Sequence, residues 1–193
     1  MIDVDGVLSL FGFPAHDPPE GGWHSIEGIP HFLSAAAARH LLALASLFEL
    51  VWCSGWEEKA DEHLPHLLGL PRGLPHLSFE RGLQPGESMH GHWKLAAIDA
   101  YAASRPLAWV DDCIDAACHA WAAARAAPTL LVATVPARGL TEREAARLRA
   151  WAQAPCYSST TSGTSSSASS STKPGSESPA PIRSSEARSA SNS

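Results

Sequence analysis

The feature that most constrains this chain is a pair of carboxylates, one residue apart, directly after a short apolar segment. The stretch from Met1 to Leu8 is interpreted as the end of a buried strand that runs into a turn. Side chains two residues apart in an extended segment point the same way, so Asp3 and Asp5 are expected to face one pocket. Gly6 allows the backbone to turn sharply beyond them. Two carboxylates this close need a divalent cation, a shared proton or a basic neighbour to offset their repulsion.

An Asp-x-Asp-Gly string is not specific to catalysis, because it also occurs in ordinary turns and in calcium-binding loops. A calcium loop is excluded here, since Val7 and Leu8 stand where further oxygen ligands should follow. An ordinary turn stays open on this segment alone. The choice between a turn and a catalytic pair therefore depends on residues further along the chain.

The composition changes sharply near Cys156 and divides the chain. Sixteen of the 37 residues from 157 to 193 are serine and few are apolar, so this segment is expected to be disordered. We predict one folded domain over residues 1–153 and a Ser-rich disordered tail over residues 154–193. The whole chain has a formal net charge of −6. This acidic balance argues against broad non-specific binding to nucleic acids but leaves a local basic site open.

The N-terminal segment lacks the basic stretch followed by an apolar stretch that a secretory signal would have. No apolar run approaches the roughly 18 residues that a membrane span needs. These features predict a cytoplasmic protein with no membrane partner. The sequence leaves the oligomeric state open.

Helix-forming and strand-forming segments alternate along the domain. Helices are expected at 34–47, 57–68, 92–103, 115–126 and, after a capping box at 141–144, up to about 152. Apolar strand-like runs lie at 48–53, 107–110 and 129–134. Residues 9–31, rich in Gly, Pro and His, are expected to form a long irregular loop of functional importance. The alternation predicts an α/β fold, a Rossmann-like three-layer sandwich with a mainly parallel central sheet.

Polar residues stand where these strands end or where a helix begins. They are Asp3 and Asp5, Ser54 and Gly55, Lys94, and Asp111 and Asp112. Ligands of parallel sheets bind at the carboxyl ends of the strands, so these residues are expected to meet at one edge. A lysine in the first turn of a helix opposes the helix dipole, which is easier to understand if an anion lies near Lys94. A solvated surface lysine is the alternative.

The order and types of these residues resemble the four motifs of the haloacid dehalogenase (HAD) superfamily. The similarity lies in the hhDxDGV start, the serine at the end of the second strand, the lysine that opens a helix and the hhhDD strand end. The strings at 49–57, 92–94 and 107–112 further resemble a group of bacterial, largely actinobacterial, HAD-like proteins of unassigned substrate. That group is similar to HAD domains linked to RNA-repair proteins. The resemblance covers roughly residues 1–152.

The resemblance implies a role for each catalytic residue. Asp3 would be the nucleophile that forms an aspartyl-phosphate, and Asp5 would protonate the leaving oxygen and then activate water. Ser54 and Lys94 would hold phosphate oxygens, and Lys94 would also reduce the repulsion between Asp3 and an incoming dianion.

The resemblance also implies a Mg²⁺ cofactor. Its ligands would be Asp3, the main-chain carbonyl of Asp5, and Asp111, with Asp112 as a further ligand or a supporting group. Hard oxygen ligands, together with phosphate and water, are what Mg²⁺ prefers. All four aspartates are therefore predicted metal-site residues.

The segments between the motifs are short. About 48 residues separate Asp5 from Ser54, and 39 separate Ser54 from Lys94. Neither segment is long enough for a full cap domain in addition to its core helices, so an open site is expected. Within the superfamily, an open site suggests a large substrate, such as a nucleic-acid end or a protein, or capping by another subunit.

Three tryptophans, Trp23, Trp56 and Trp93, are expected to flank the site. Exposed indoles there would stack on a base or a sugar. Packing in the core or at the rim of the site is the alternative, because tryptophan is mostly buried on average. Trp56, next to Gly55, is included among the predicted substrate-binding residues.

The predicted function is a Mg²⁺-dependent phosphohydrolase that acts through an aspartyl-phosphate on a phosphomonoester. The expected partner is a phosphorylated small molecule, including a nucleotide, or a nucleic-acid end. Only two residues precede Asp3, where a central strand of roughly five is expected. This short strand motivates an alternative function, a non-catalytic phosphate-binding or regulatory HAD-like domain. Phosphoryl transfer to an acceptor other than water is not separable from hydrolysis by sequence.

Overall fold

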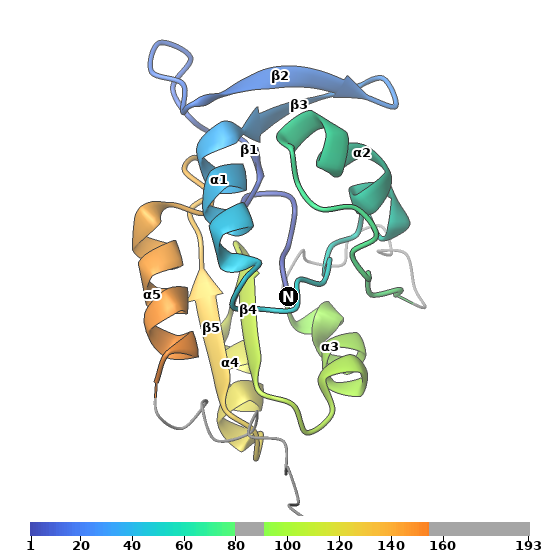
Figure 1. The fold of residues 1–193 in the computed structure, drawn as a ribbon, viewed down its shortest axis with the longest axis vertical. Coiled ribbons are helices and arrows are strands. Elements are labelled where there is room, and N and C mark those ends of the chain that lie inside the picture. The colour runs from blue at the N-terminus through green and yellow to red at the C-terminus, as the bar shows by residue number, and fades with distance from the viewer. Residues whose placement is uncertain (80–90, 155–193) are drawn as a thin grey trace, which may run out of the picture. The chain divides into compact units, whose positions relative to one another are not determined.

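The computed structural model describes residues 1–79 and 91–154 (Figure 1). The predicted tail at 154–193 lies outside the described residues apart from its first position. Within the described part of the chain, no helix has the length and apolar character needed to cross a membrane. The domain contains both helices and strands and is of the α/β class.

The helices and strands follow one another in this order along the chain: β1 (Ser9–Leu10), β2 (Gly21–Ile26), β3 (Ile29–Ser34), α1 (Ala35–Leu44), α2 (Glu58–Leu68), the 3₁₀ helix η1 (Gly91–Lys94), α3 (Leu95–Ala102), β4 (Leu107–Asp111), α4 (Ala116–Ala124), β5 (Thr129–Ala133) and α5 (Glu142–Ala152). Helices therefore occupy the five regions where the sequence predicts them. The capping box predicted at 141–144 is present, with Thr141 as the N-cap of α5.

The parallel sheet is built around the first residues of the chain. Ile2 is bridged to Trp52 on one side and to Val110 of β4 on the other, both in parallel register. Trp52 is bridged in turn to His76, and β4 pairs with β5 in parallel. The Asp3 N–H donates to the Val110 carbonyl at 3.0 Å. The short first segment is thus central and hydrogen-bonded on both sides, which fixes the backbone of Asp3.

Residues that alternate along the parallel segments pack into two separate apolar clusters. The first joins α1, α2 and α5 to sheet residues that include Ile2, Trp52 and Val110. The second joins α3 and α4 to sheet residues that include Met1, Val51 and Trp109. Successive side chains of a strand point to opposite faces, so the two clusters lie on opposite faces of the parallel segments.

The prediction of an irregular loop at 9–31 is wrong. This segment forms β1, β2 and the start of β3, which pair antiparallel in the order β1-β3-β2. The β2–β3 hairpin turns at Glu27 and Gly28, and both have a positive φ, 51° and 82°. A two-residue turn of this kind matches the twist of the two strands it joins. The Glu-Gly pair is a weaker hairpin signal than Asn-Gly. The Gly-rich and His-rich composition of the segment therefore predicts a loop rather than a hairpin.

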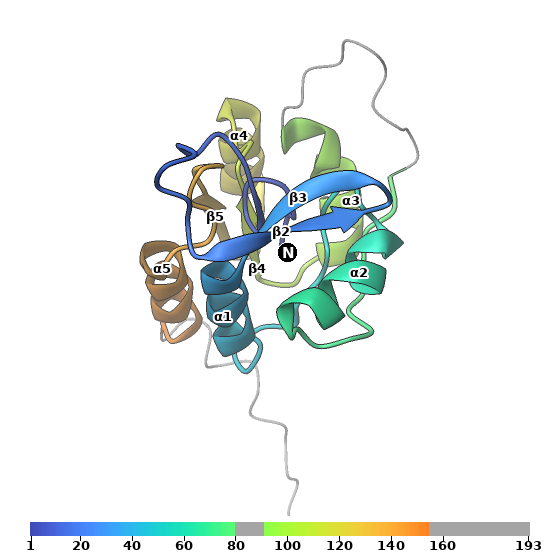
Figure 2. The same cartoon turned by 90° about the horizontal axis from the view of Figure 1, so that it is seen from above.

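The β2–β3 hairpin lies across the carboxyl edge of the parallel strands. Figure 1 shows it beyond the arrowheads of β4 and β5, and Figure 2 shows it crossing over them from above. The hairpin is too small to be a cap domain, but it covers part of the edge where the polar residues converge. The hairpin belongs to the segment between Asp5 and Ser54, and it is the part of that segment that reaches the site.

Two helix starts differ from the sequence prediction. The segment expected to be a helix from residue 92 begins as η1, and Lys94 is the N-cap of α3 rather than a residue of its first turn. The helix expected from residue 57 begins at Glu58, and Pro65 lies inside it without ending it. The helix ends four residues later, at Gly69 in the left-handed conformation.

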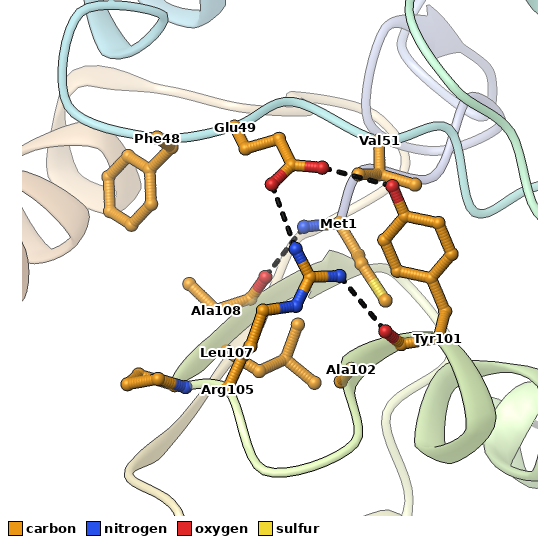
Figure 3. Close-up of a pocket in the computed structure, with 10 residues that line it drawn as sticks. Met1, Phe48, Glu49, Val51, Tyr101, Ala102, Arg105, Leu107 and Ala108 are labelled. Atoms are coloured by element: carbon orange, nitrogen blue, oxygen red, sulfur yellow. Dashed lines mark hydrogen bonds and ion pairs between the residues drawn. The ribbon is translucent and has the colours of Figure 1, made fainter. Parts of the chain in front are cut away.

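A pocket of about 200 Å³ opens at the amino end of the parallel strands (Figure 3). The Met1 amino group donates to the Ala108 carbonyl at 2.7 Å beside it. At its rim, the Glu49 carboxylate accepts hydrogen bonds from Tyr101 and Arg105 at 3.0 and 2.9 Å. Because this pocket lies at the sheet edge opposite to the convergent polar residues, it is not part of the candidate site.

Candidate active site

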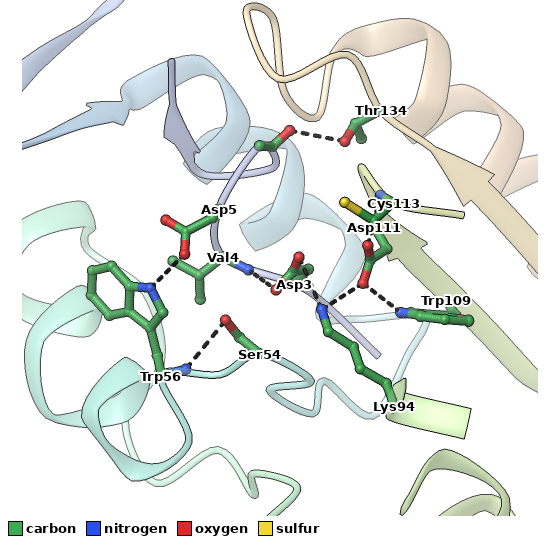
Figure 4. A network of polar contacts seen from close by, with 11 residues as sticks. Asp3, Val4, Asp5, Ser54, Trp56, Lys94, Trp109, Asp111, Cys113 and Thr134 are labelled. Atoms are coloured by element: carbon green, nitrogen blue, oxygen red, sulfur yellow. Dashed lines mark hydrogen bonds and ion pairs between the residues drawn. The ribbon is translucent and has the colours of Figure 1, made fainter. Parts of the chain in front are cut away.

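Three charged side chains from distant parts of the chain meet at the carboxyl edge of the sheet (Figure 4). The ammonium of Lys94 lies 3.0 Å from Asp3 Oδ2 and 2.7 Å from Asp111 Oδ2. All three residues are buried, with 4%, 6% and 0% of the surface of Lys94, Asp3 and Asp111 exposed. The position of Lys94 at the junction of η1 and α3 directs its amine into the sheet edge, so the alternative of a solvated surface lysine does not apply.

Two buried carboxyl groups share one ammonium, so the charges balance only while one carboxyl group is protonated. Burial raises the pKa of Asp3 to about 7, against the opposing attraction of Lys94. Burial alone would lower the pKa of Lys94, but the carboxylates of Asp3 and Asp111 outweigh it and raise that pKa above its ordinary value. Lys94 is therefore an ammonium ion at any physiological pH, and the site gains a net negative charge only as Asp3 ionises.

Asp111 is held by donors on both of its oxygens. Oδ2 accepts from the Trp109 indole N–H at 3.2 Å as well as from Lys94, and Oδ1 accepts from the Cys113 N–H at 2.8 Å. Sequence reasoning missed Trp109 as a donor. No local signal distinguishes an indole that packs from one that also donates, since both are buried in a strand.

The two aspartates of the first motif have different partners. Asp3 Oδ1 accepts from the Val4 N–H at 2.8 Å, while its Oδ2 faces Lys94. Asp5 is only partly buried, and its Oδ2 accepts from the Trp56 indole N–H at 2.9 Å. Figure 4 shows Asp3 directed toward Lys94 and Asp5 directed toward Trp56. The backbone turn between them thus separates a buried carboxylate from an accessible one.

Ser54 ends the strand-like segment beside Asp3 and is 1% exposed. Its Oγ accepts from the Trp56 N–H at 3.4 Å, and its carbonyl accepts from the Glu57 N–H at 3.0 Å. These contacts form a tight turn that carries the chain from the sheet edge into α2. Gly55 is exposed in this turn and faces Trp93. The hydroxyl and the turn are therefore at the same edge as the charged residues.

Asp112 lies against the turn of the first motif. Gly6 has a φ of +69°, and a Cβ atom placed on it would come within 2.5 Å of the Asp112 Cγ atom. Asp112 is half-buried, and this burial raises its pKa. The absence of a side chain at Gly6 thus lets the second carboxylate of the hhhDD motif approach the first motif.

The donor set at this edge fits a hard divalent cation. The ligand atoms of Asp111, Asp112 and Cys113 lie within 4.8 Å of one another. Burial raises the pKa of the Cys113 thiol to about 12, which disfavours the thiolate form that binds metals. The remaining donors are carboxylate oxygens, which suit Mg²⁺ rather than a thiophilic metal. When Asp3 is ionised, the two carboxylates carry one more negative charge than Lys94 offsets, and a bound cation would balance it.

Two of the three tryptophans expected to flank the site lie beside it. Trp56 contacts Asp5, and the Trp93 ring lies 5.4 Å from the Lys94 ammonium. Trp23 is 66% exposed and packs edge-on against Phe32, its cross-strand neighbour on the hairpin. The adjacent cross-strand pair, His24 and His31, projects from the other face of the hairpin, and His31 contacts Trp56 there. Trp23 is thus on the face that turns away from the site.

The comparisons with known proteins agree with this geometry. A family model described as the HAD domain in Swiss Army Knife RNA repair proteins matches residues 1–145. The chain belongs to this family. The HAD resemblance seen in the sequence is thereby confirmed, and with it membership of a superfamily of phosphatases and other hydrolases that generally uses Mg²⁺. The matched residues of this HAD domain include all of the predicted site positions. Searches of the curated proteins and of the solved structures found no match.

Proposed function

We propose that this HAD domain is a Mg²⁺-dependent phosphohydrolase that acts through an aspartyl-phosphate on Asp3. The observation that supports this most is the buried contact of Lys94 with both Asp3 and Asp111. A carboxylate whose backbone is hydrogen-bonded into the centre of the parallel segments, next to an ammonium and a second carboxylate, is suited to attack an anionic phosphorus centre once a cation is present.

The reaction is proposed to proceed in two steps. In the first, a carboxylate oxygen of Asp3 forms a bond to phosphorus, the bond to the leaving oxygen breaks, and Asp5 gives that oxygen its proton. In the second, Asp5 takes a proton from water while the water oxygen attacks phosphorus, and the Asp3 carboxylate is released with inorganic phosphate. The partly exposed position of Asp5 supports this assignment, because it can reach both a leaving group and water.

The phosphate-binding groups are proposed to be Ser54, Gly55 and Lys94. The Ser54 hydroxyl can donate its proton to a phosphate oxygen, since its oxygen accepts a hydrogen bond from the Trp56 N–H. Gly55 leaves room for the phosphate to approach the backbone of that turn. Lys94, the one cation in contact with Asp3 among the described residues, would offset repulsion between Asp3 and the incoming phosphate dianion.

Mg²⁺ would be held by Asp3, Asp111 and Asp112, with the main-chain carbonyl of Asp5. When bound, it would supply positive charge to the phosphate oxygens and to the carboxylates around it. The arrangement of Gly6 and Asp112 supports this ligand set, because the carboxylate of Asp112 can lie against the first motif only if residue 6 has no side chain.

The proposed substrate is a phosphomonoester, with a nucleotide or a nucleic-acid end as the leading class. Two observations support a large substrate: the described residues contain a hairpin rather than a cap domain over the site, and the matching family is named for RNA repair proteins. The net charge of −6 indicates that such a substrate would be held locally rather than by a broad basic surface.

We also infer a Rossmann-like three-layer sandwich for the domain. The two apolar clusters on opposite faces of the parallel segments support it, since α1, α2 and α5 contribute to one and α3 and α4 to the other. In such a fold the carboxyl edge of the sheet is the ligand-binding edge. The position of the charged residues is consistent with that rule.

The test is phosphate release by the full chain from sugar phosphates, nucleotides and phosphate-ended oligonucleotides, with and without Mg²⁺. Asp3→Asn should abolish release while leaving the fold intact, and Asp17→Asn, an exposed aspartate in the loop after β1, should behave as the unaltered protein. Turnover that survives in Asp3→Asn would refute the nucleophile. Tight binding of phosphate-ended ligands by a folded protein without turnover would favour the alternative, a non-catalytic phosphate-binding domain.

A further inference from the structure

The carboxylate of Asp5 has a specific hydrogen-bond donor that the proposed mechanism does not use. Its Oδ2 accepts from the Trp56 indole N–H at 2.9 Å. Within residues 1–79 and 91–154, no other hydrogen bond or ion pair to this carboxylate is observed. Trp56 is therefore the residue that determines where the Asp5 side chain points (Figure 4).

Trp56 is itself held by the β2–β3 hairpin. The His31 ring packs edge-on against the Trp56 ring, with centroids 4.7 Å apart and an angle of 65° between the planes. His31 Nδ1 shares a hydrogen bond with Ser9 Oγ at 3.1 Å, and the Ser9 carbonyl accepts from the Gly6 N–H at 2.7 Å. Gly6 follows Asp5 in the chain. The contacts thus form a closed ring that begins and ends at Asp5.

The ring of contacts links segments that the sequence separates widely. Asp5 and Gly6 belong to the first motif, Trp56 to the turn before α2, and His31 to β3. His31 is paired across the hairpin with His24, so both lie on the face opposite to Trp23. The inner face of the hairpin therefore touches the site through His31.

We infer that Trp56 is a positioning residue for Asp5, and that the hairpin maintains this position through His31. The inference deepens the proposed function and rests on it, because it assumes that Asp5 is the acid and base of the reaction. The indole N–H occupies Oδ2, so the transferable proton is carried by Oδ1. In the first step the O–H bond at Oδ1 breaks as the O–H bond of the leaving group forms, and the water proton returns to the same oxygen in the second.

The first test is Trp56→Phe, which keeps an aromatic ring but removes the N–H. A general acid contributes about 10²–10⁴-fold, and mainly to leaving groups that need a proton. For an alkyl phosphate, kcat/KM should fall by about 10²-fold, whereas for p-nitrophenyl phosphate, whose leaving group departs as an anion, it should fall less than about threefold. The ratio kcat/KM is the proper measure, since it reports on the step that forms the aspartyl-phosphate.

The matched control is Trp23→Phe, the same change on the outer face of the hairpin, which should alter neither value. His31→Ala should reproduce the dependence on leaving group with a smaller loss. Equal losses on the two substrates in Trp56→Phe would overturn the inference. A KM that rises in Trp56→Ala but is normal in Trp56→Phe would also overturn the inference, because that pattern indicates stacking on the substrate.

A second readout does not depend on turnover. The indole N–H resonance of Trp56, assigned by its loss in Trp56→Phe, should move upfield and exchange faster with water in Asp5→Ala. An unchanged resonance would overturn the inference. Absence of turnover by the unaltered protein would refute the proposed function and the role of Trp56 with it, whereas turnover with equal losses would refute the role of Trp56 alone.

Discussion

Gly6 and Asp112 are packed so closely that residue 6 has no room for a side chain. A Cβ atom there would lie 2.5 Å from the Asp112 Cγ atom and closer still to its Oδ2. The Gly6 carbonyl also accepts from the buried Thr134 hydroxyl at 2.9 Å. The turn of the first motif is therefore locked against the ends of β4 and β5, and the Gly of the hhDxDGV motif has a packing role in addition to its turn.

Gly6→Ala should destabilise the protein more than a left-handed backbone alone explains. Left-handed φ costs about 1–2 kcal/mol for a non-glycine residue, and the overlap with Asp112 should bring the total to about 3 kcal/mol or more. Gly12→Ala is the control, because Gly12 has a φ of +76° and a Cβ atom added there would meet no other atom within 4 Å. Denaturant unfolding of both variants gives the difference. Equal losses would show that Asp112 moves aside at no cost.

Lys94→Met should leave two buried carboxylates without a cationic partner. Breaking a buried charge pair by removing one member costs about 3–5 kcal/mol. Lys59→Met is the comparison, because the ion pair of Lys59 with Glu27 is exposed to solvent and should contribute little to stability. Adding Asp3→Asn to Lys94→Met should recover part of the loss. A Lys94→Met protein as stable as Lys59→Met would contradict the buried arrangement.

The stability of the metal-free protein should depend on pH through Asp3. Its pKa is raised from 3.8 to about 7 in the folded state, so folding favours the protonated form. This contribution is fully present below about pH 4 and is lost as the pH rises to about 7, a change on the order of 4 kcal/mol. The measurement is the unfolding free energy of the unaltered protein minus that of Asp3→Asn, in the presence of a chelator. A difference that stays constant from pH 4 to 7 would contradict the raised pKa.

Mg²⁺ should raise the midpoint of thermal unfolding if the carboxylates bind it, because a ligand that binds only the folded state stabilises it. Asp112→Asn should weaken the affinity about 10–100-fold, as is typical for residues around a metal. Asp17→Asn should leave the affinity unchanged. A midpoint that Mg²⁺ does not move, at concentrations where phosphate release is maximal, would place the ion on the substrate rather than on the protein.

The predictable parts of this protein are those with a local signal. The capping box at Thr141 marks the start of α5, and the apolar run before Asp111 marks β4, because both follow from neighbouring residues. The hairpin at 21–34 has no comparable local signal, since its Gly-rich and His-rich composition predicts a loop. Lys94 was expected inside a helix, but a 3₁₀ turn precedes α3 and makes it the N-cap.

The sequence by itself determined which chemical groups stand at the ends of strands and that the chain alternates between helix and strand. Those properties depend on residues that are near one another in the chain. Only the tertiary structure decided that Lys94 lies between Asp3 and Asp111 and that the hairpin's His31 supports Trp56 against Asp5. These contacts join residues that are tens of positions apart, and packing, rather than propensity or spacing, determines which donor meets which acceptor.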